Sequence, residues 1–324
     1  MATPRRRYDA VVLENRPLCR EHWRVRVSVG QTLPATQPGQ FVQLSCRPPQ
    51  SAIDHDRLLG ATRSYSDLQQ IELCEQVPLL RRPFSLAGRG DDAGGTWLDI
   101  IYRVVGVGTR WLSQLRAGQM VDLIGPLGRG FELPAGKSLG LLVGGGVGLP
   151  PMLYLAEALA KAGWQAVAFI GAQTADLLPV NLLPHQQPST DGNPTRCVSE
   201  FARHDLPTAV TTDDGSLGPK GFITDALDRF LSRLSQADAR RCVIFACGPE
   251  PMMRAAAALA ASRDLACQVS LERTMACGLG TCQSCIVRIE DATDPHGRTA
   301  DGRPWRYRLA CTDGPVFDAR QVFW

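Results

Sequence analysis

Three cysteines lie within nine positions in the stretch "MACGLGTCQSCIVRI", which covers residues 275–289. They are Cys277, Cys282 and Cys285, so four residues separate the first pair and two separate the second. Thiolates grouped this closely are typical of a metal centre in a reducing compartment, where disulfide frameworks are rare. Three sulfurs seldom complete such a centre, so a fourth ligand is expected elsewhere in the chain.

Cys311, in "LACTDGPVF", is the most plausible fourth ligand and follows Cys285 after 25 residues. The opening spacing is that of plant-type [2Fe–2S] sites. Gly278 and Gly280 allow the loop to wrap closely and to point amides at the sulfurs. The alternatives are a structural zinc site, which usually has two C-x2-C pairs where this chain has one, and inert thiols. We predict a cluster held by Cys277, Cys282, Cys285 and Cys311.

A glycine-rich turn is the second candidate site. In "LLVGGGVGLPPM" a buried run leads into a predicted helix that begins at Pro150 or Pro151, and the glycines between them are Gly144, Gly145, Gly146 and Gly148. Glycines allow a phosphate to approach the backbone, and proline suits a first helical turn. The spacing is not G-x-G-x-x-G, and taken alone a structural turn explains it equally well. Combined with "ACGPEPMM", where Cys247 and Gly248 end a later strand, it predicts a dinucleotide site.

Two short stretches nearer the N-terminus could also bind a cofactor. "RRPFSLAG" offers a guanidinium to a pyrophosphate and a hydroxyl to a ring nitrogen. "IYRVVGVGT" places Gly106, Gly108 and Thr109 in a turn that could hold a phosphate. Each is individually no more specific than an ordinary strand and turn. The five histidines lack metal spacing and no Ser–His–Asp arrangement is visible, which disfavours hydrolysis.

The elements that would position these residues change along the chain. Six short β-rich runs from Tyr8 to about Pro134 predict a small antiparallel barrel. From Ser138, buried strands alternate with helices, which predicts a parallel α/β sheet. We therefore expect a multi-domain β and α/β protein with a barrel at residues 1–136, a nucleotide-binding domain at 137–264 and a small cluster domain at 265–324. Polar stretches around 49–78 and 290–304 are interpreted as insertions.

Composition limits the class of protein. The 324 residues carry a net charge of +3, which gives no reason to expect nucleic acid or a membrane surface as a partner. No run approaches the roughly 18 apolar residues of a membrane helix, and no secretory signal follows the basic start, so the predicted compartment is the cytoplasm. Of the eleven cysteines, most outside the cluster are predicted to be small buried hydrophobes; the scattered ones are Cys19, Cys46, Cys74, Cys197, Cys242, Cys247 and Cys267.

The order of these motifs resembles the ferredoxin-reductase superfamily. More narrowly, the chain is similar to the electron-transfer subunits of type B dihydroorotate dehydrogenases. "TDDGSLGPKGFITD", "SLERTMACGLGTCQSC" and "CTDGPVF" narrow the resemblance, together with "GGGVGLPPM". The stretches around 49–78 and 290–304 depart from it and put the partner interface in doubt more than the cofactors.

The resemblance implies three redox groups. NAD would bind at the glycine turn and near Cys247 and Gly248, and a [2Fe–2S] cluster would bind on the four cysteines. FAD would be held by Arg82, Pro83, Phe84, Ser85, Ile101, Tyr102, Arg103, Gly108 and Thr109. Ser85 is the candidate to hydrogen-bond the flavin N5 edge, and Cys247 the candidate to border the nicotinamide.

The resemblance also implies a separate FMN-bearing subunit that oxidises dihydroorotate in pyrimidine biosynthesis, in a complex of two copies of each chain. Because nicotinamide exchanges hydride and the cluster single electrons, the flavin is expected between them. The alternatives are a reductase subunit of a sulfhydrogenase-like or other redox complex, and a zinc-bearing scaffold. "FIGAQTADLL" does not distinguish NAD from NADP.

Overall fold

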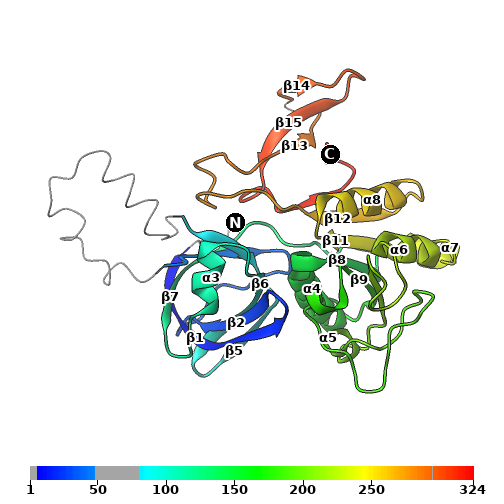
Figure 1. Cartoon of the computed structure of the whole chain (residues 1–324). Helices are drawn as coiled ribbons and strands as arrows, with labels where there is room; N and C mark the ends of the chain where they lie inside the picture. Colours follow the sequence, from blue (N-terminus) through cyan, green and yellow to red (C-terminus); the bar gives the residue numbers. More distant parts are fainter. Residues whose placement is uncertain (1–5, 48–79, 294) are drawn as a thin grey trace.

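The computed structural model describes residues 6–47, 80–293 and 295–324 and contains three sheets (Figure 1). The predicted insertion around 49–78 and Cys74 lie outside the described residues. Within them no helix is long and apolar enough to cross a membrane.

The first sheet is antiparallel and curls round on itself. Its strand order is β4-β3-β7-β1-β2-β6-β5. The two edge strands, β4 and β5, are joined in the chain by only Leu86 and Ala87. Leu86 N donates to Gln40 O at 3.2 Å and Ala87 N to Asp99 O at 2.8 Å, so this short segment connects the two edges. The strand bounds are β1 Arg6–Cys19, β2 His22–Ser28, β3 Phe41–Leu44, β4 Arg82–Ser85, β5 Gly88–Asp92, β6 Gly95–Arg103 and β7 Met120–Leu127.

The expected antiparallel barrel is confirmed as this curled sheet, with one strand more than the pattern predicted. All six β-rich runs form strands, but β5 has the sequence "GRGDD", which lacks the β-branched and aromatic residues that signal a strand. It forms because β6 offers it a partner from Gly88↔Asp99 to Asp92↔Gly95. A single helix, α3 Val107–Ser113, connects β6 to β7.

The second sheet has the order β10-β9-β8-β11-β12-β16. Neighbouring strands from β10 to β12 are parallel, and β16 is antiparallel to β12. The apolar residues of helix α4 pack on one face, while those of α6 and α8 pack on the other. The bounds are β8 Leu139–Gly145, η2 Gly146–Gly148, α4 Leu149–Lys161, β9 Gln165–Ala172, η3 Ala175–Leu177, α5 Ser199–Ala202, β10 Thr208–Thr212, α6 Ile223–Leu231, α7 Gln236–Arg241, β11 Cys242–Cys247, α8 Glu250–Ala261, β12 Ala266–Ser270 and β16 Val316–Asp318.

A third, three-stranded sheet carries the end of the cysteine segment. Its order is β13-β15-β14, with β13 Ile286–Glu290, β14 Gly297–Arg298 and β15 Pro304–Leu309. The predicted insertion at 290–304 contains β14 and the turns around it. β12 and β16 lie inside the predicted cluster range 265–324, yet they hydrogen-bond to the parallel sheet. The domain boundaries themselves stay a prediction.

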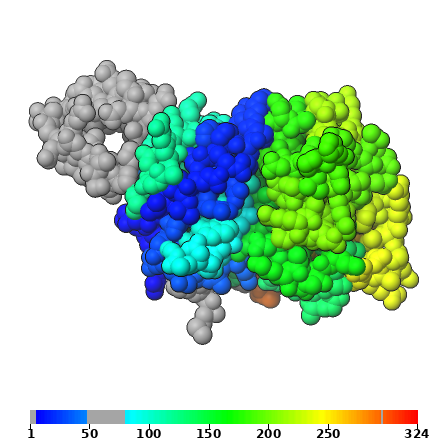
Figure 2. Space-filling view, turned by 90° about the horizontal axis from the view of Figure 1, so that it is seen from below, coloured from blue at the N-terminus to red at the C-terminus, as the bar shows by residue number. Residues whose placement is uncertain are grey.

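The barrel and the parallel-sheet half lie side by side (Figures 1 and 2). The Tyr154 hydroxyl of α4 donates to Thr36 O at 3.1 Å, and Arg20 Nε pairs with Asp176 at 2.7 Å. The third sheet projects from the side of the molecule that faces away from the viewer in Figure 2, so little of it is visible there. The contacts across the two halves position the strand ends that form the site.

One buried carboxylate stabilises the place where the barrel closes. Asp99 is 7% exposed, accepts two hydrogen bonds from Arg26 at 2.7 and 2.8 Å, and pairs with Arg24. Burial opposes its ionisation, but the hydrogen bonds from both arginines outweigh burial and hold the pKa of Asp99 below its usual value. A lowered folded-state pKa stabilises the fold above the unfolded pKa of about 4, and this is lost as the pH falls through the folded pKa.

We expect Asp99→Asn to lower the free energy of unfolding by about 2–3 kcal/mol at neutral pH, because it leaves two partly buried guanidiniums without their carboxylate. Urea denaturation at pH 7 and below pH 4 measures the free energy of unfolding, and the difference in this free energy between variant and wild type should be smaller in acid. Asp264→Asn is the control, because Asp264 pairs with Arg320 at 2.8 Å on the surface and such pairs contribute under about 1 kcal/mol. Equal losses in the two variants would contradict the prediction.

Candidate functional site

A cavity of about 950 Å³ lies where the barrel, the parallel sheet and the segment before the cysteines meet. Strands β4 and β6, the start of α3, the turn after β8, the end of β11 and residues 270–276 contribute to its wall. Of the predicted site residues, these line it: Arg82, Pro83, Phe84, Ser85, Ile101, Tyr102, Arg103, Gly108, Thr109, Gly148, Cys247 and Gly248. A cavity of this size can enclose a cofactor.

The barrel side of the cavity combines aromatic surface with positive charge. Phe84 and Tyr102 pack edge to face with ring centroids 5.9 Å apart. Arg82 and Arg103 bring two guanidiniums; Arg103 also donates to Glu21 at 2.7 Å. The Thr109 hydroxyl accepts from Gly106 N at 3.1 Å and fixes the turn before α3. This side offers a flat apolar slot beside groups that bind phosphate.

The parallel-sheet side is formed where two glycine turns touch. A Cβ on Gly148 would lie 2.1 Å from the carbonyl oxygen of Cys247, so only glycine allows the turn after β8 to approach the end of β11 this closely. Gly144, Gly145 and Gly146 support the turn but do not line the cavity. From β8 the chain continues to β9 on one side of the sheet, whereas from β11 it continues to β12 on the other side. Two neighbouring strands whose connections diverge in this way leave a crevice at their carboxyl ends, where such sheets bind ligands.

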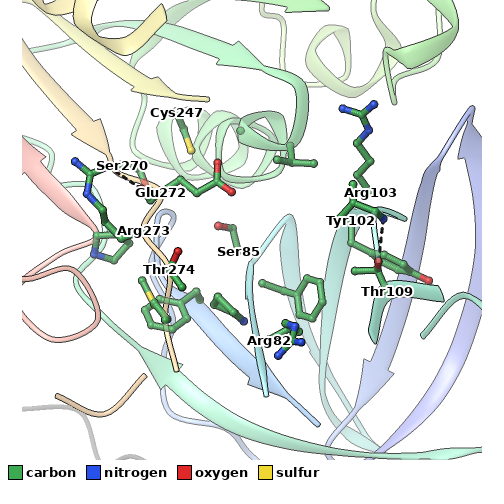
Figure 3. Close-up of a pocket in the computed structure, with 18 of the residues that line it drawn as sticks. Arg82, Ser85, Tyr102, Arg103, Thr109, Cys247, Ser270, Glu272, Arg273 and Thr274 are labelled. Carbon is green, nitrogen blue, oxygen red and sulfur yellow. Dashed lines mark hydrogen bonds between the residues drawn. The ribbon is translucent and has the colours of Figure 1, made fainter. Parts of the chain in front are cut away.

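Ser85, Cys247 and Glu272 face the open middle of the cavity from different elements (Figure 3). Burial, only partly offset by a hydrogen bond with Ser270, raises the pKa of the Cys247 thiol to about 12. Cys247 therefore stays protonated at neutral pH. It can shape the cavity but cannot act as a thiolate nucleophile.

Sequence reasoning missed the wall formed by Ser270–Ala276. Glu272 reaches into the cavity, and Arg273 is held by an ion pair of 2.9 Å with Glu250 at the start of α8. The available signal was the alternating run before Glu272, which forms β12 and ends at the same sheet edge as β8 and β11.

The four predicted cysteine ligands lie directly beyond this wall and associate in two pairs. Cys277 Sγ accepts from Cys282 N at 3.4 Å and from Leu279 N at 3.3 Å. Cys285 Sγ accepts from Cys311 N at 3.4 Å, although 26 positions separate the two residues. Cys277 and Cys311 also interact electrostatically, so the pairs adjoin. Cys285 and Cys311 are buried, whereas Cys282 is exposed.

This arrangement fits a two-iron cluster. Each iron of a [2Fe–2S] group takes two cysteine thiolates, which matches two adjoining pairs. Structural zinc sites usually have two C-x2-C pairs, whereas this segment has one. Hydrogen bonds, foremost with Ser284, lower the pKa of Cys282 to about 6, while burial and Cys285 raise that of Cys311 to about 12. A bound metal would ionise Cys311 as well.

The other cysteines follow expectation with one exception. Cys46, Cys197, Cys242, Cys247 and Cys267 are buried, and burial raises the pKa of each. Cys19 at the end of β1 is only partly buried. It is the exception among the described residues.

Comparison with known proteins agrees with this geometry. Residues 272–323 match the iron–sulfur cluster binding domain of dihydroorotate dehydrogenase B. A relative from Geobacillus sp. (strain WCH70), named dihydroorotate dehydrogenase B (NAD(+)), electron transfer subunit, is 37% identical over 247 residues, which cover 76% of this chain and 80% of the relative. One of the same name from Desulforamulus reducens is 35% identical over 287 residues, or 89% and 87% of the two chains.

Solved structures share the fold. An NADH-dependent reduced ferredoxin-NADP oxidoreductase superposes with a TM-score of 0.70 at 24% identity and covers 100% of this chain and 91% of its own. An Amycolatopsis cytochrome P450 reductase gives 0.56 at 24% identity over 81% and 68%. A ferredoxin-reductase-like fold that ends in this cysteine segment, together with relatives above one-third identity along most of the chain, shows that the protein belongs to the family of dihydroorotate dehydrogenase B electron transfer subunits.

Proposed function

We propose that this chain passes electrons from a partner dihydroorotate dehydrogenase through a [2Fe–2S] cluster and FAD to NAD+, in pyrimidine biosynthesis. The observation that carries the proposal is the continuity of one segment: Met275 and Ala276 line the cavity, and the next residue is Cys277. A cofactor in the cavity and a cluster on the cysteines would be neighbours, as electron transfer requires.

The barrel side of the cavity suits FAD, which exchanges both hydride and single electrons when bound. Arg82 and Arg103 would bind its pyrophosphate, and Phe84 and Tyr102 would pack against its apolar surface. Ser85 would donate its hydroxyl to the N5 edge of the ring. These are positioning roles, because holding two reactants in register supplies most of what a hydride transfer needs from a protein.

The parallel-sheet side suits the nicotinamide co-substrate. Gly148 and Gly248 line the cavity without a side chain, so a dinucleotide phosphate could approach their backbone. Because the Cys247 thiol stays protonated, it would border the nicotinamide and exclude water without exchanging a proton. Gly144, Gly145 and Gly146 would hold the turn in shape.

The partner would be a separate, FMN-bearing catalytic subunit, two copies of each chain forming the complex. Exposed Cys282 and Leu279, which is 38% exposed, mark the open side of the cysteine loop as the place where electrons would enter.

Dihydroorotate-dependent NADH formation by the complex, purified natively through this subunit, tests the proposal. Cys311→Ser should abolish the activity and the broad iron–sulfur absorption while flavin absorption and the partner remain, because three sulfurs cannot hold both irons. Cys19→Ser, outside the cysteine loop, is the control and should retain both. An active complex that oxidises another donor and not dihydroorotate would instead favour a reductase subunit of a different redox complex.

Gly148→Ala should weaken NADH binding by at least about tenfold, because its Cβ would meet the Cys247 carbonyl at 2.1 Å and separate the two turns. The dependence of the flavin reduction rate on NADH concentration, followed by stopped-flow absorbance, measures this affinity, and the flavin and cluster absorption of the unreduced variant should match wild type. Gly88→Ala is the matched control, since its nearest contact would be 3.8 Å. Unaltered NADH affinity in Gly148→Ala would remove this turn from the site.

Ser85→Ala should slow flavin reduction by NADH about 100-fold at unchanged FAD content, if the hydroxyl donates a hydrogen bond to the flavin while hydride passes from NADH to it. Stopped-flow absorbance follows the step. Ser113→Ala on α3 removes a hydroxyl that donates to Arg110 O at 2.8 Å and does not line the cavity, so it should not alter the rate. Equal rates in both variants would assign Ser85 a packing role.

A further inference from the structure

Gln43 is a fully buried polar residue on the barrel strand β3. Its neighbours Val42 and Leu44 belong to the barrel core, whereas Phe41 packs in the apolar cluster that contains Cys285 and Cys311. Side chains alternate along a strand, so Gln43 points out of the barrel on the same face as Phe41. That face is turned toward the cysteine segment.

Neither polar atom of the Gln43 carboxamide has a hydrogen-bond partner within the described residues. Burying an amide without partners is unfavourable, so such a group in a native protein calls for a partner such as a water, an ion or a bound group. Gln40, three residues earlier, shows the ordinary case. Its Nε2 donates to Gly128 O at 2.9 Å and its Oε1 accepts from Gln37 N at 2.8 Å.

The carboxamide lies against the loop that carries the cluster ligands. A Cβ on Gly278, the residue after Cys277, would be 2.5 Å from Gln43 Nε2. Gly278 has a φ of +70°, a backbone conformation that favours glycine. Because Gly278 has no side chain, the Gln43 side chain has room to approach the loop. On β4 the residue paired with Gln43 is Pro83, which lines the cavity. Gln43 therefore stands between the cavity wall and the cysteine loop.

We propose that Gln43 is a positioning residue whose amide N–H donates to a sulfur of the cluster held by this loop and raises the cluster's reduction potential. Cys277 Sγ already accepts two backbone N–H groups, so N–H to sulfur bonds are the local pattern. Such bonds stabilise the more negative, reduced cluster. The inference rests on the proposed function, because it requires an iron–sulfur cluster on these cysteines.

The test replaces the carboxamide by an apolar side chain of similar length, Gln43→Met, in the full complex. Redox titration followed by electron paramagnetic resonance should show a lower cluster potential. We expect about a tenfold shift in electron partition between cluster and flavin, equal to about 59 mV for a one-electron couple. The resonance of the reduced cluster should change, and the flavin potential should not. Gln43→Leu should give the same shift and serves if the first variant does not fold.

Gln40→Leu is the matched control. It removes a buried carboxamide that has its own protein partners, so it should lower thermal stability and leave both potentials at their wild-type values. An unchanged cluster potential in both Gln43 variants, or a shift in the flavin potential in its place, overturns the proposal. Absence of an iron–sulfur resonance from the wild-type protein would instead refute the proposed function, so the two failures are distinguishable.

Discussion

The pairing of β12 with β16 is the constraint on which the site depends. Ser270 pairs with Val316, and Leu271 N donates to Pro315 O at 2.9 Å, so both ends of the cysteine segment are fixed at one edge of the parallel sheet. Arg129 N donates to Gly314 O at 2.6 Å and joins the same place to the end of the barrel. A loop closed at its base in this way can bring distant sulfurs together at little further entropic cost.

The same constraint places two chemically different sites on one continuous wall. Leaving β12, the chain first lines the cavity and then enters the cysteine loop without an intervening element. The barrel supplies the charged and aromatic half of the cavity, and the two glycine turns supply the other half, which Gly148 and Gly248 line without side chains. Because each half comes from a separate sheet, the cavity requires the two sheets to be docked, and Tyr154 and Arg20 contribute to that docking.

Three buried polar residues of the barrel differ in where they find hydrogen-bond partners. Asp99 is satisfied by two arginines where the barrel closes, and Gln40 is satisfied by backbone groups beside it. Gln43 has no such partners although it is equally buried and only three residues away. Asp99 and Gln40 take their partners from the protein itself, whereas a residue beside a bound group can take its partner from that group.

The sequence determined the chemistry and most of the elements. The spacing of four cysteines, the glycine turns after buried strands and the Arg-Pro-x-Ser strand were readable because short motifs and hydrophobic periodicity are local properties. Twelve predicted cofactor residues line one cavity, as expected for motifs at the ends of neighbouring strands.

Tertiary structure decided the rest. β5 depends on β6 for its pairing, and β16 joins a sheet from which 45 residues or more separate it in the chain. The cysteines form the pairs 277/282 and 285/311. Glu272 and Gln43 are placed only by contacts between segments that are distant in the chain. Local sequence does not predict such contacts, because the burial and the partners of a side chain depend on which other parts of the fold pack against it.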